Sequence, residues 1–82
     1  MSGLAHSVAD ADVYSAMATA KALLSAELRR QNMSNAELAR RMGKFPQEMT
    51  KLLNPAVYTK LGTLEAAFAA LGKRLVVSVE DA

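Results

Sequence analysis

Residues 35–54, NAELARRMGKFPQEMTKLLN, contain the small, apolar and turn-forming residues that two short helices crossing at a tight turn require. Ser34 and Glu37 have the spacing of a capping box, in which each side chain accepts a hydrogen bond from the other residue's backbone N–H. Ala39 is small enough to let a second helix approach closely, and Gly43 suits the positive φ of a helix end. The sequence therefore predicts a short helix that begins at this cap and ends at the glycine.

Pro46 is suited to the first position of a second helix, because the N–H that proline lacks has no helical partner there. Met49, Leu52 and Leu53 then share one face of this helix, and polar residues share the other. A helix divided in this way can pack inward and still offer hydrogen-bonding groups to base edges in the major groove of DNA. The pair is typical of a helix-turn-helix, and an ordinary helical hairpin is the alternative.

Two further helices are predicted on either side of this pair. The first is long and alanine-rich, with apolar residues at helical spacing at Val13, Met17, Ala20, Leu24 and Leu28. The last is expected to be capped by Gly62 or Thr63 and to place Phe68 at the centre of the core. The helices are expected at about 10–31, 34–42, 46–54 and 63–71, after a frayed N-terminus over residues 1–9.

The segment LVVSVE at residues 75–80 is the one strand signal in the chain, because it is rich in β-branched residues and its alternation places Leu75, Val77 and Val79 on one face. No other segment reads as its partner, so we expect it to pair with the same strand of a second subunit across a twofold axis. A frayed tail is the alternative. The expected fold is all-α with one C-terminal β-strand, and dimerisation is expected through Leu75, Val76, Val77, Ser78 and Val79.

Composition excludes several classes of protein. A chain of 82 residues supports one small domain with a thin core. Cysteine is absent, which excludes disulfides and thiolate metal sites. No long apolar run indicates a signal peptide or a membrane span, so a cytoplasmic protein is expected. His6 has no partners nearby, and there is neither a glycine-rich phosphate loop nor metal-ligand spacing, so we expect no catalytic residue, no metal site and no cofactor.

Positive charge gathers around the central pair of helices although the net charge is only +2. Residues 29–60 hold seven Lys or Arg side chains against two Glu. Binding of such a patch to a DNA duplex releases counterions, which favours the complex. The affinity of the chain for DNA would therefore fall steeply as the salt concentration rises. A solvated helix face is the alternative interpretation.

Residues 37–80 resemble the C-terminal DNA-binding domain of HicB-type antitoxins, and residues 35–54 resemble the helix-turn-helix of the XRE or Cro/repressor-like group. The resemblance extends from Leu28 to about Glu80. Its more specific elements are ELARR at 37–41, TKL at 59–61, TLEAA at 63–67 and ALGKRL at 70–75. It implies a lambda-repressor-like domain and a repressor that binds its own promoter as a dimer, usually alongside a toxin that cleaves mRNA.

The first functional hypothesis is therefore a dimeric, sequence-specific repressor of the antitoxin type, bound to a palindromic operator in double-stranded DNA. The exposed face of the second short helix would read bases through Gln47, Thr50 and Lys51, with Asn54 on the same face. The expected phosphate contacts are Asn35, Arg41, Lys44, Thr59 and Lys60. The second hypothesis is a protein-interaction module that binds a toxin or another partner, with the helix-turn-helix as scaffold only.

Overall fold

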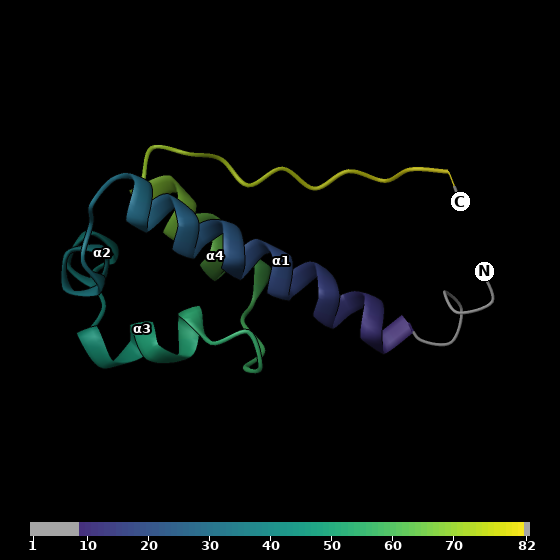
Figure 1. Ribbon diagram of the computed structural model, residues 1–82, viewed down its shortest axis with the longest axis horizontal. Helices are drawn as coiled ribbons and strands as arrows, with labels where there is room; N and C mark the ends of the chain where they lie inside the picture. The colour runs from purple at the N-terminus through teal and green to yellow at the C-terminus, as the bar shows by residue number, and fades with distance from the viewer. Residues whose placement is uncertain (1–8, 82) are drawn as a thin grey trace.

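The computed structural model describes the backbone of residues 9–81 and the side chains from Ala16 to Asp81. In this part of the chain there are four helices and no strand: α1 (Ala9–Arg30), α2 (Asn35–Met42), α3 (Pro46–Leu53) and α4 (Leu61–Ala70). The long helix α1 runs through most of the length of the domain (Figure 1). Both α3 and α4 pack against α1, and α2 contacts α3 and α4. The all-α part of the prediction therefore agrees with the structure. Of the N-terminus expected to fray, residues 1–8, which include His6, lie outside the described residues, and Ala9 is the first residue of α1.

The predicted C-terminal strand is wrong. After Lys73, whose N–H donates to the carbonyl of Phe68, residues 74–81 continue as an extended segment that runs back along α1 (Figure 1) and is not a strand. Alternating β-branched residues favour extended backbone, but a strand also needs a partner, and no second extended segment lies beside this one in residues 9–81. This overturns the expected strand pairing between subunits through Leu75, Val76, Val77, Ser78 and Val79.

The burial of the C-terminal segment also departs from the expected alternation. Leu75 is partly buried against the core, whereas Val77 and Val79, which were expected to share its face, are 66% and 96% exposed. Only the first apolar residue of the segment therefore packs on the domain.

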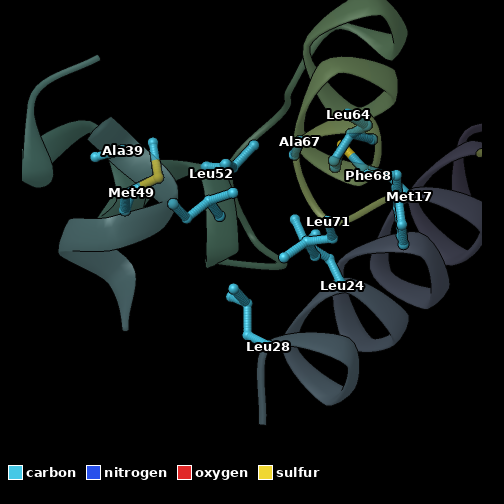
Figure 2. Close-up of a cluster of buried hydrophobic side chains, with 11 residues drawn as sticks. Met17, Leu24, Leu28, Ala39, Met49, Leu52, Leu64, Ala67, Phe68 and Leu71 are labelled. Atoms are coloured by element: carbon cyan, nitrogen blue, oxygen red, sulfur yellow. The ribbon is translucent and has the colours of Figure 1, made fainter. Parts of the chain in front are cut away.

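The core lies where the four helices meet (Figure 2). One stripe of α1 supplies Met17, Leu24 and Leu28, as its helical spacing predicted. The other helices and the end of α4 add Leu38, Ala39, Met49, Leu52, Leu64, Ala67, Phe68 and Leu71. Ala20 is only partly buried beside this cluster, and the side chain of Val13 lies outside the described part.

The turn between α2 and α3 follows from local sequence. Ser34 Oγ accepts a hydrogen bond from the N–H of Glu37 at 3.1 Å, which caps α2. The other half of the predicted capping box does not form, because the Glu37 carboxylate is bound by arginines. Gly43 ends the helix with a φ of 70°, in the left-handed region. Ala39 is 1% exposed, so the small residue does lie inside the packed domain.

Helices α3 and α4 start in different ways. At α3 the carboxylate of Glu48 accepts from the N–H of Phe45 at 2.8 Å, ahead of Pro46. Helix α4 begins at Leu61, earlier than the cap expected at Gly62 or Thr63, and Lys60 is its N-cap without a side-chain hydrogen bond. The Lys60 carbonyl accepts from the N–H groups of Thr63 and Leu64, which are the first backbone hydrogen bonds of α4.

Residues 9–81 include no helix with the length and apolar character that a bilayer crossing demands.

Candidate nucleic-acid interface

The outer face of α3 carries the residues expected to read bases. Gln47, Thr50 and Lys51 are all exposed, whereas Met49 and Leu52 on the opposite face are buried. Because α3 is fixed to the core by its apolar face, the three polar side chains point out from a rigid support. Nothing in the described part of the chain covers them.

A hollow of about 310 Å³ lies between α3 and the start of α4. Lys44, Lys51 and Lys60 line it, together with Thr59. These residues come from the α2–α3 turn, from α3 and from the loop before α4, and the fold brings them to one place. Glu48 also lines the hollow, so three cationic side chains stand against one carboxylate, and the excess of positive charge suits phosphate oxygens.

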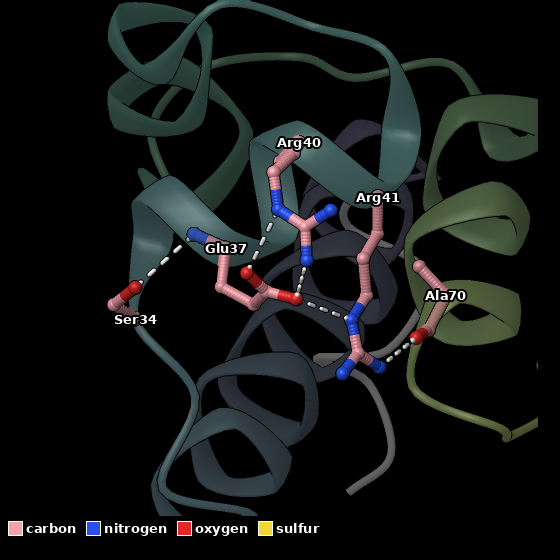
Figure 3. A network of polar contacts seen from close by, with 5 residues as sticks. All are labelled: Ser34, Glu37, Arg40, Arg41 and Ala70. Carbon is pink, nitrogen blue, oxygen red and sulfur yellow. Dashed lines mark hydrogen bonds and ion pairs between the residues drawn. The ribbon is translucent and has the colours of Figure 1, made fainter.

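The cations of α2 are arranged differently (Figure 3). The Glu37 carboxylate accepts from Arg40 Nε at 3.0 Å and from Arg41 Nε at 2.9 Å. Hydrogen bonds from these arginines, with that from Arg40 the stronger influence, lower the pKa of Glu37 below its ordinary value. Arg41 also donates from Nη1 to the carbonyl of Ala70 at 3.1 Å, which links α2 to the last turn of α4. Arg41, expected to contact phosphate, is thus engaged within the domain and is not beside the lysine-lined hollow.

The other predicted contact residues lie at separate points. Asn35 is exposed at the first residue of α2 and lines a different hollow, which it shares with Arg29. Asn54 is exposed at the end of α3, but its Oδ1 already accepts from the N–H of Ala56 at 2.9 Å. Thr59 is partly buried, and its N–H donates to Met17 Sδ at 3.3 Å. Asn35 and Asn54 therefore lie outside the hollow. The predicted contact residues that line it are Lys44, Lys51, Thr59 and Lys60.

Ion pairs reduce the positive charge available to a ligand. Of the seven cations in residues 29–60, Arg40 and Arg41 pair with Glu37, and Arg30 pairs with Glu27. Lys44 Nζ lies 3.8 Å from a Glu48 oxygen, which is a weak contact. Arg29, Lys51 and Lys60 have no ion pair among the described side chains. Lys51 on α3 and Lys60 before α4 are therefore the unpaired cations that line the hollow.

The sequence interpretation missed a buried cation, Lys21. Its side chain is 1% exposed, and Nζ donates to the backbone carbonyls of Lys51, Asn54 and Val57. Burial lowers the pKa of this ammonium from its ordinary value. A signal was present, because Lys21 lies four residues after Met17 and three before Leu24, on the stripe of α1 that forms the core.

Phe45 was also missed. It precedes α3 directly and is 70% exposed, although it is one of only two phenylalanines in the chain. At a helix N-cap, Ser, Thr, Asp or Asn is usual, so an aromatic residue there is unexpected for the fold alone. The pair FP at positions 45–46 was the available signal.

No protein-family model matches the chain. Over 56 residues the chain is 43% identical to a protein named Antitoxin HicB 2 from Photorhabdus laumondii subsp. laumondii. The matched region is 68% of this chain and 40% of that protein, so the chain spans less than half the length of this relative. The chain is therefore similar to a HicB antitoxin over most of its own length.

Proposed function

We propose that this chain is a sequence-specific DNA-binding repressor of the antitoxin type, which regulates its own promoter. In this proposal α2 and α3 act as a helix-turn-helix, and α3 lies in the major groove. The observation that carries the proposal is the outer face of α3, where Gln47, Thr50 and Lys51 are exposed beside a hollow lined by lysines. Similarity to a protein named as an antitoxin supports the biological role.

The residues on the outer face of α3 would contact bases, and the residues around the hollow would contact phosphates. Gln47 is suited to the paired donor and acceptor of adenine, and Lys51 to the acceptors of guanine. Lys44, Thr59 and Lys60 would contact phosphates and fix the register of α3 on the duplex. Asn35, exposed at the first turn of α2, would add a contact at the other edge of the interface.

A homodimer would place two α3 helices in successive major grooves, roughly 34 Å apart, on a palindromic operator. A toxin is the further partner that the relative's name suggests for this chain.

Selection of duplexes from a random DNA library by the purified chain tests the proposal directly. We expect enrichment of a palindromic sequence, and affinity that falls steeply as the salt concentration rises. Failure to bind any duplex in a salt-dependent manner would overturn the proposed function.

A second candidate function is a protein-interaction module with α2 and α3 as scaffold. A groove of about 510 Å³ between α1, the start of α4 and the C-terminal segment favours it. Large apolar side chains stand exposed at this groove: Leu23 is 57%, Leu61 50% and Val76 70% exposed. A toxin would be the partner, by analogy with the named relative. Binding of a cognate toxin without any salt-dependent DNA binding would favour this candidate over the repressor.

A further inference from the structure

We infer that Lys21 is a positioning residue for the DNA contacts, because it holds the end of α3 and the loop that leads to Lys60. The inference rests on the proposed function. Lys21 itself is 1% exposed and would not touch DNA. Its effect would pass through the backbone that it binds.

The Lys21 ammonium uses its three donors on three carbonyls. Nζ lies 3.2 Å from the carbonyl oxygen of Lys51, 2.8 Å from that of Asn54 and 2.5 Å from that of Val57. These acceptors belong to the last turn of α3, its C-cap and the following loop. A single side chain on α1 therefore ties together a segment that begins within the recognition helix and ends just before the hollow.

The charge of Lys21 suits this place. The last carbonyls of a helix have no partner within the helix, and they carry the negative end of its dipole. Helix α2 solves this locally with Gly43, but α3 ends at Asn54 with a φ of −82° and no left-handed residue. Lys21 supplies from another helix donors that add to the local ones, because the carbonyls of Lys51 and Asn54 also accept from the N–H groups of Asn54 and Val57. Without Lys21, the carbonyl of Val57 would lose the donor that it has among the described residues.

A second contact from α1 holds the same loop. Met17, one helical turn before Lys21, accepts a hydrogen bond at Sδ from the N–H of Thr59. The face of α1 that carries both residues thus fixes the chain at residues 51–57 and again at Thr59. The position of Lys60 relative to Lys51 across the hollow therefore depends on α1.

The first test replaces the ammonium in steps. Lys21→Gln keeps two N–H donors, and Lys21→Met keeps the shape of the side chain without donors. At a temperature where circular dichroism shows each variant folded, we expect the affinity for a selected duplex to fall in the order Lys, Gln, Met. The Met variant should bind about tenfold more weakly at about 0.1 M salt, the effect of losing one phosphate contact.

A matched control separates positioning from simple stability. Leu28→Ala removes a buried side chain of α1 that does not bond to the loop, so it lowers stability without releasing residues 54–60. The folded Leu28→Ala variant should bind DNA as the wild type does. Equal weakening by Leu28→Ala and Lys21→Met would overturn the inference.

Chemical rescue tests the charge itself. The chain contains no cysteine, so Lys21→Cys can be alkylated at one site in denaturant and then refolded. An aminoethyl group restores an ammonium at nearly the length of lysine, whereas a propyl group gives the same length without charge. We expect the aminoethyl form to regain affinity and the propyl form to remain weak. Equal affinities of the two forms would contradict the inference.

Amide hydrogen exchange, measured without DNA, tests the anchoring by Lys21 independently of the proposed DNA binding. In Lys21→Met, exchange should accelerate at residues 54–60 more than in α2. If it does and no form of the chain binds DNA, the proposed function fails while the anchoring by Lys21 stands. If the wild type binds DNA and neither exchange nor affinity changes in the variant, the inference about Lys21 fails.

A different observation carries a second inference, which also rests on the proposed function: we propose that Phe45 contacts the C5 methyl group of a thymine. Phe45 is 70% exposed and lies directly before α3, the end of a recognition helix that enters the groove. A polar residue at this N-cap would stabilise the helix more than the exposed aromatic ring does, so the ring is free to serve a contact outside the fold. In the major groove the apolar group available to it is the thymine methyl.

Phe45→Ser provides the test, because serine is a favoured N-cap residue and the variant should be at least as stable as the wild type. In the selected duplex, each thymine is replaced in turn by uracil, which lacks the methyl. We expect the wild type to lose affinity at one position, and Phe45→Ser to bind both duplexes equally weakly there. Tyr58→Ser, which removes another exposed aromatic ring, should keep the preference for thymine. A thymine preference that survives in Phe45→Ser would overturn this inference.

Discussion

Helices α2 and α3 are each eight residues long and both carry cations, but they hold them differently. In α2 the carboxylate of Glu37 binds Arg40 and Arg41, so the charges of that helix are largely satisfied within the domain. On α3, Lys51 is exposed and has no ion pair among the described side chains. It lines the same hollow as Lys60. The difference teaches that a count of positive charges along the sequence does not tell which of them a ligand can use.

The two helices also end differently. A glycine within the turn ends α2, so the signal is local and can be read from the sequence. At the end of α3 the N–H of Asn54 donates to the carbonyl of Lys51, and Pro55 follows, but Lys21 also binds there, thirty residues away in sequence from the nearest carbonyl that it contacts. The first helix end is therefore encoded beside it, whereas the second combines a local signal with a contact from α1.

The largest expected effect tests whether α2 and α3 share one core. Phe68 on α4 is 7% exposed, and Phe68→Ala should lower the free energy of unfolding by about 3 to 5 kcal/mol. Such a loss is a large part of the stability of a small domain, so both helices should melt together. Urea denaturation followed by circular dichroism measures it. Phe45→Ala removes the exposed phenylalanine and should cost far less. Similar losses from the two variants would contradict the core described above.

The next largest effect concerns what the outer face of α3 does. Gln47 is exposed, so Gln47→Ala should leave stability nearly unchanged. It should abolish discrimination of about 1 to 3 kcal/mol at one base pair, because a bidentate contact to adenine is lost. Competition between the selected duplex and its single-base variants measures this discrimination. Unchanged preferences at every position would remove Gln47 from the interface.

A smaller effect compares the cations of the two helices directly. Lys60→Ala should lower the slope of log affinity against log salt by about 0.9, the contribution of one phosphate. Arg40→Ala should change this slope much less, because Glu37 already holds the guanidinium. Glu37→Gln should steepen the slope by releasing the arginines of α2. An Arg40→Ala variant that behaves like Lys60→Ala would show that the ion pairs of α2 do not restrain its charge.

The smallest effect is the response to acid. Hydrogen bonds from Arg30 and then Gln31 lower the pKa of Glu27 from 4.5 to about 2, and Arg40 and Arg41 lower that of Glu37. The folded chain binds fewer protons than the unfolded chain below about pH 4.5, so its stability should fall as the pH falls from 4.5 towards 2. Thermal unfolding across this range measures the decline.

Two substitutions assign the acid response to these carboxylates. Glu27→Gln and Glu37→Gln should each make thermal stability less dependent on pH between 4.5 and 2. Glu65→Gln, on the exposed part of α4, serves as the control. A decline that is equally steep in all three variants would show that other groups cause it.

Features of the fold set by neighbouring residues could be predicted from the sequence. The cap at Ser34, the left-handed Gly43 and the buried stripe of α1 each depend on spacing within one segment. The error at residues 75–80 has the opposite origin, because a strand is defined by a partner and residue preference alone cannot supply one. Helix α4 begins at Leu61, after Lys60 without a side-chain cap, so the preference of residue types for the N-cap did not mark its start.

The candidate site shows the same limit. Exposure of Gln47, Thr50 and Lys51 followed from the period of α3 and could be predicted. The engagement of Arg41 with the carbonyl of Ala70 and the carbonyls that Lys21 binds could not, since both depend on contacts between helices distant in sequence. A charged residue on a buried stripe was the available clue to Lys21.

The extended segment after α4 has a practical consequence. Its backbone is already in the conformation that a protease active site accepts, and beyond Leu75 its apolar side chains are largely exposed. Within residues 9–81, limited digestion of the folded chain should therefore cut first beyond Leu75, where the chain leaves the core. The trimmed product should keep its helical circular dichroism, because the four helices end before the site of cleavage.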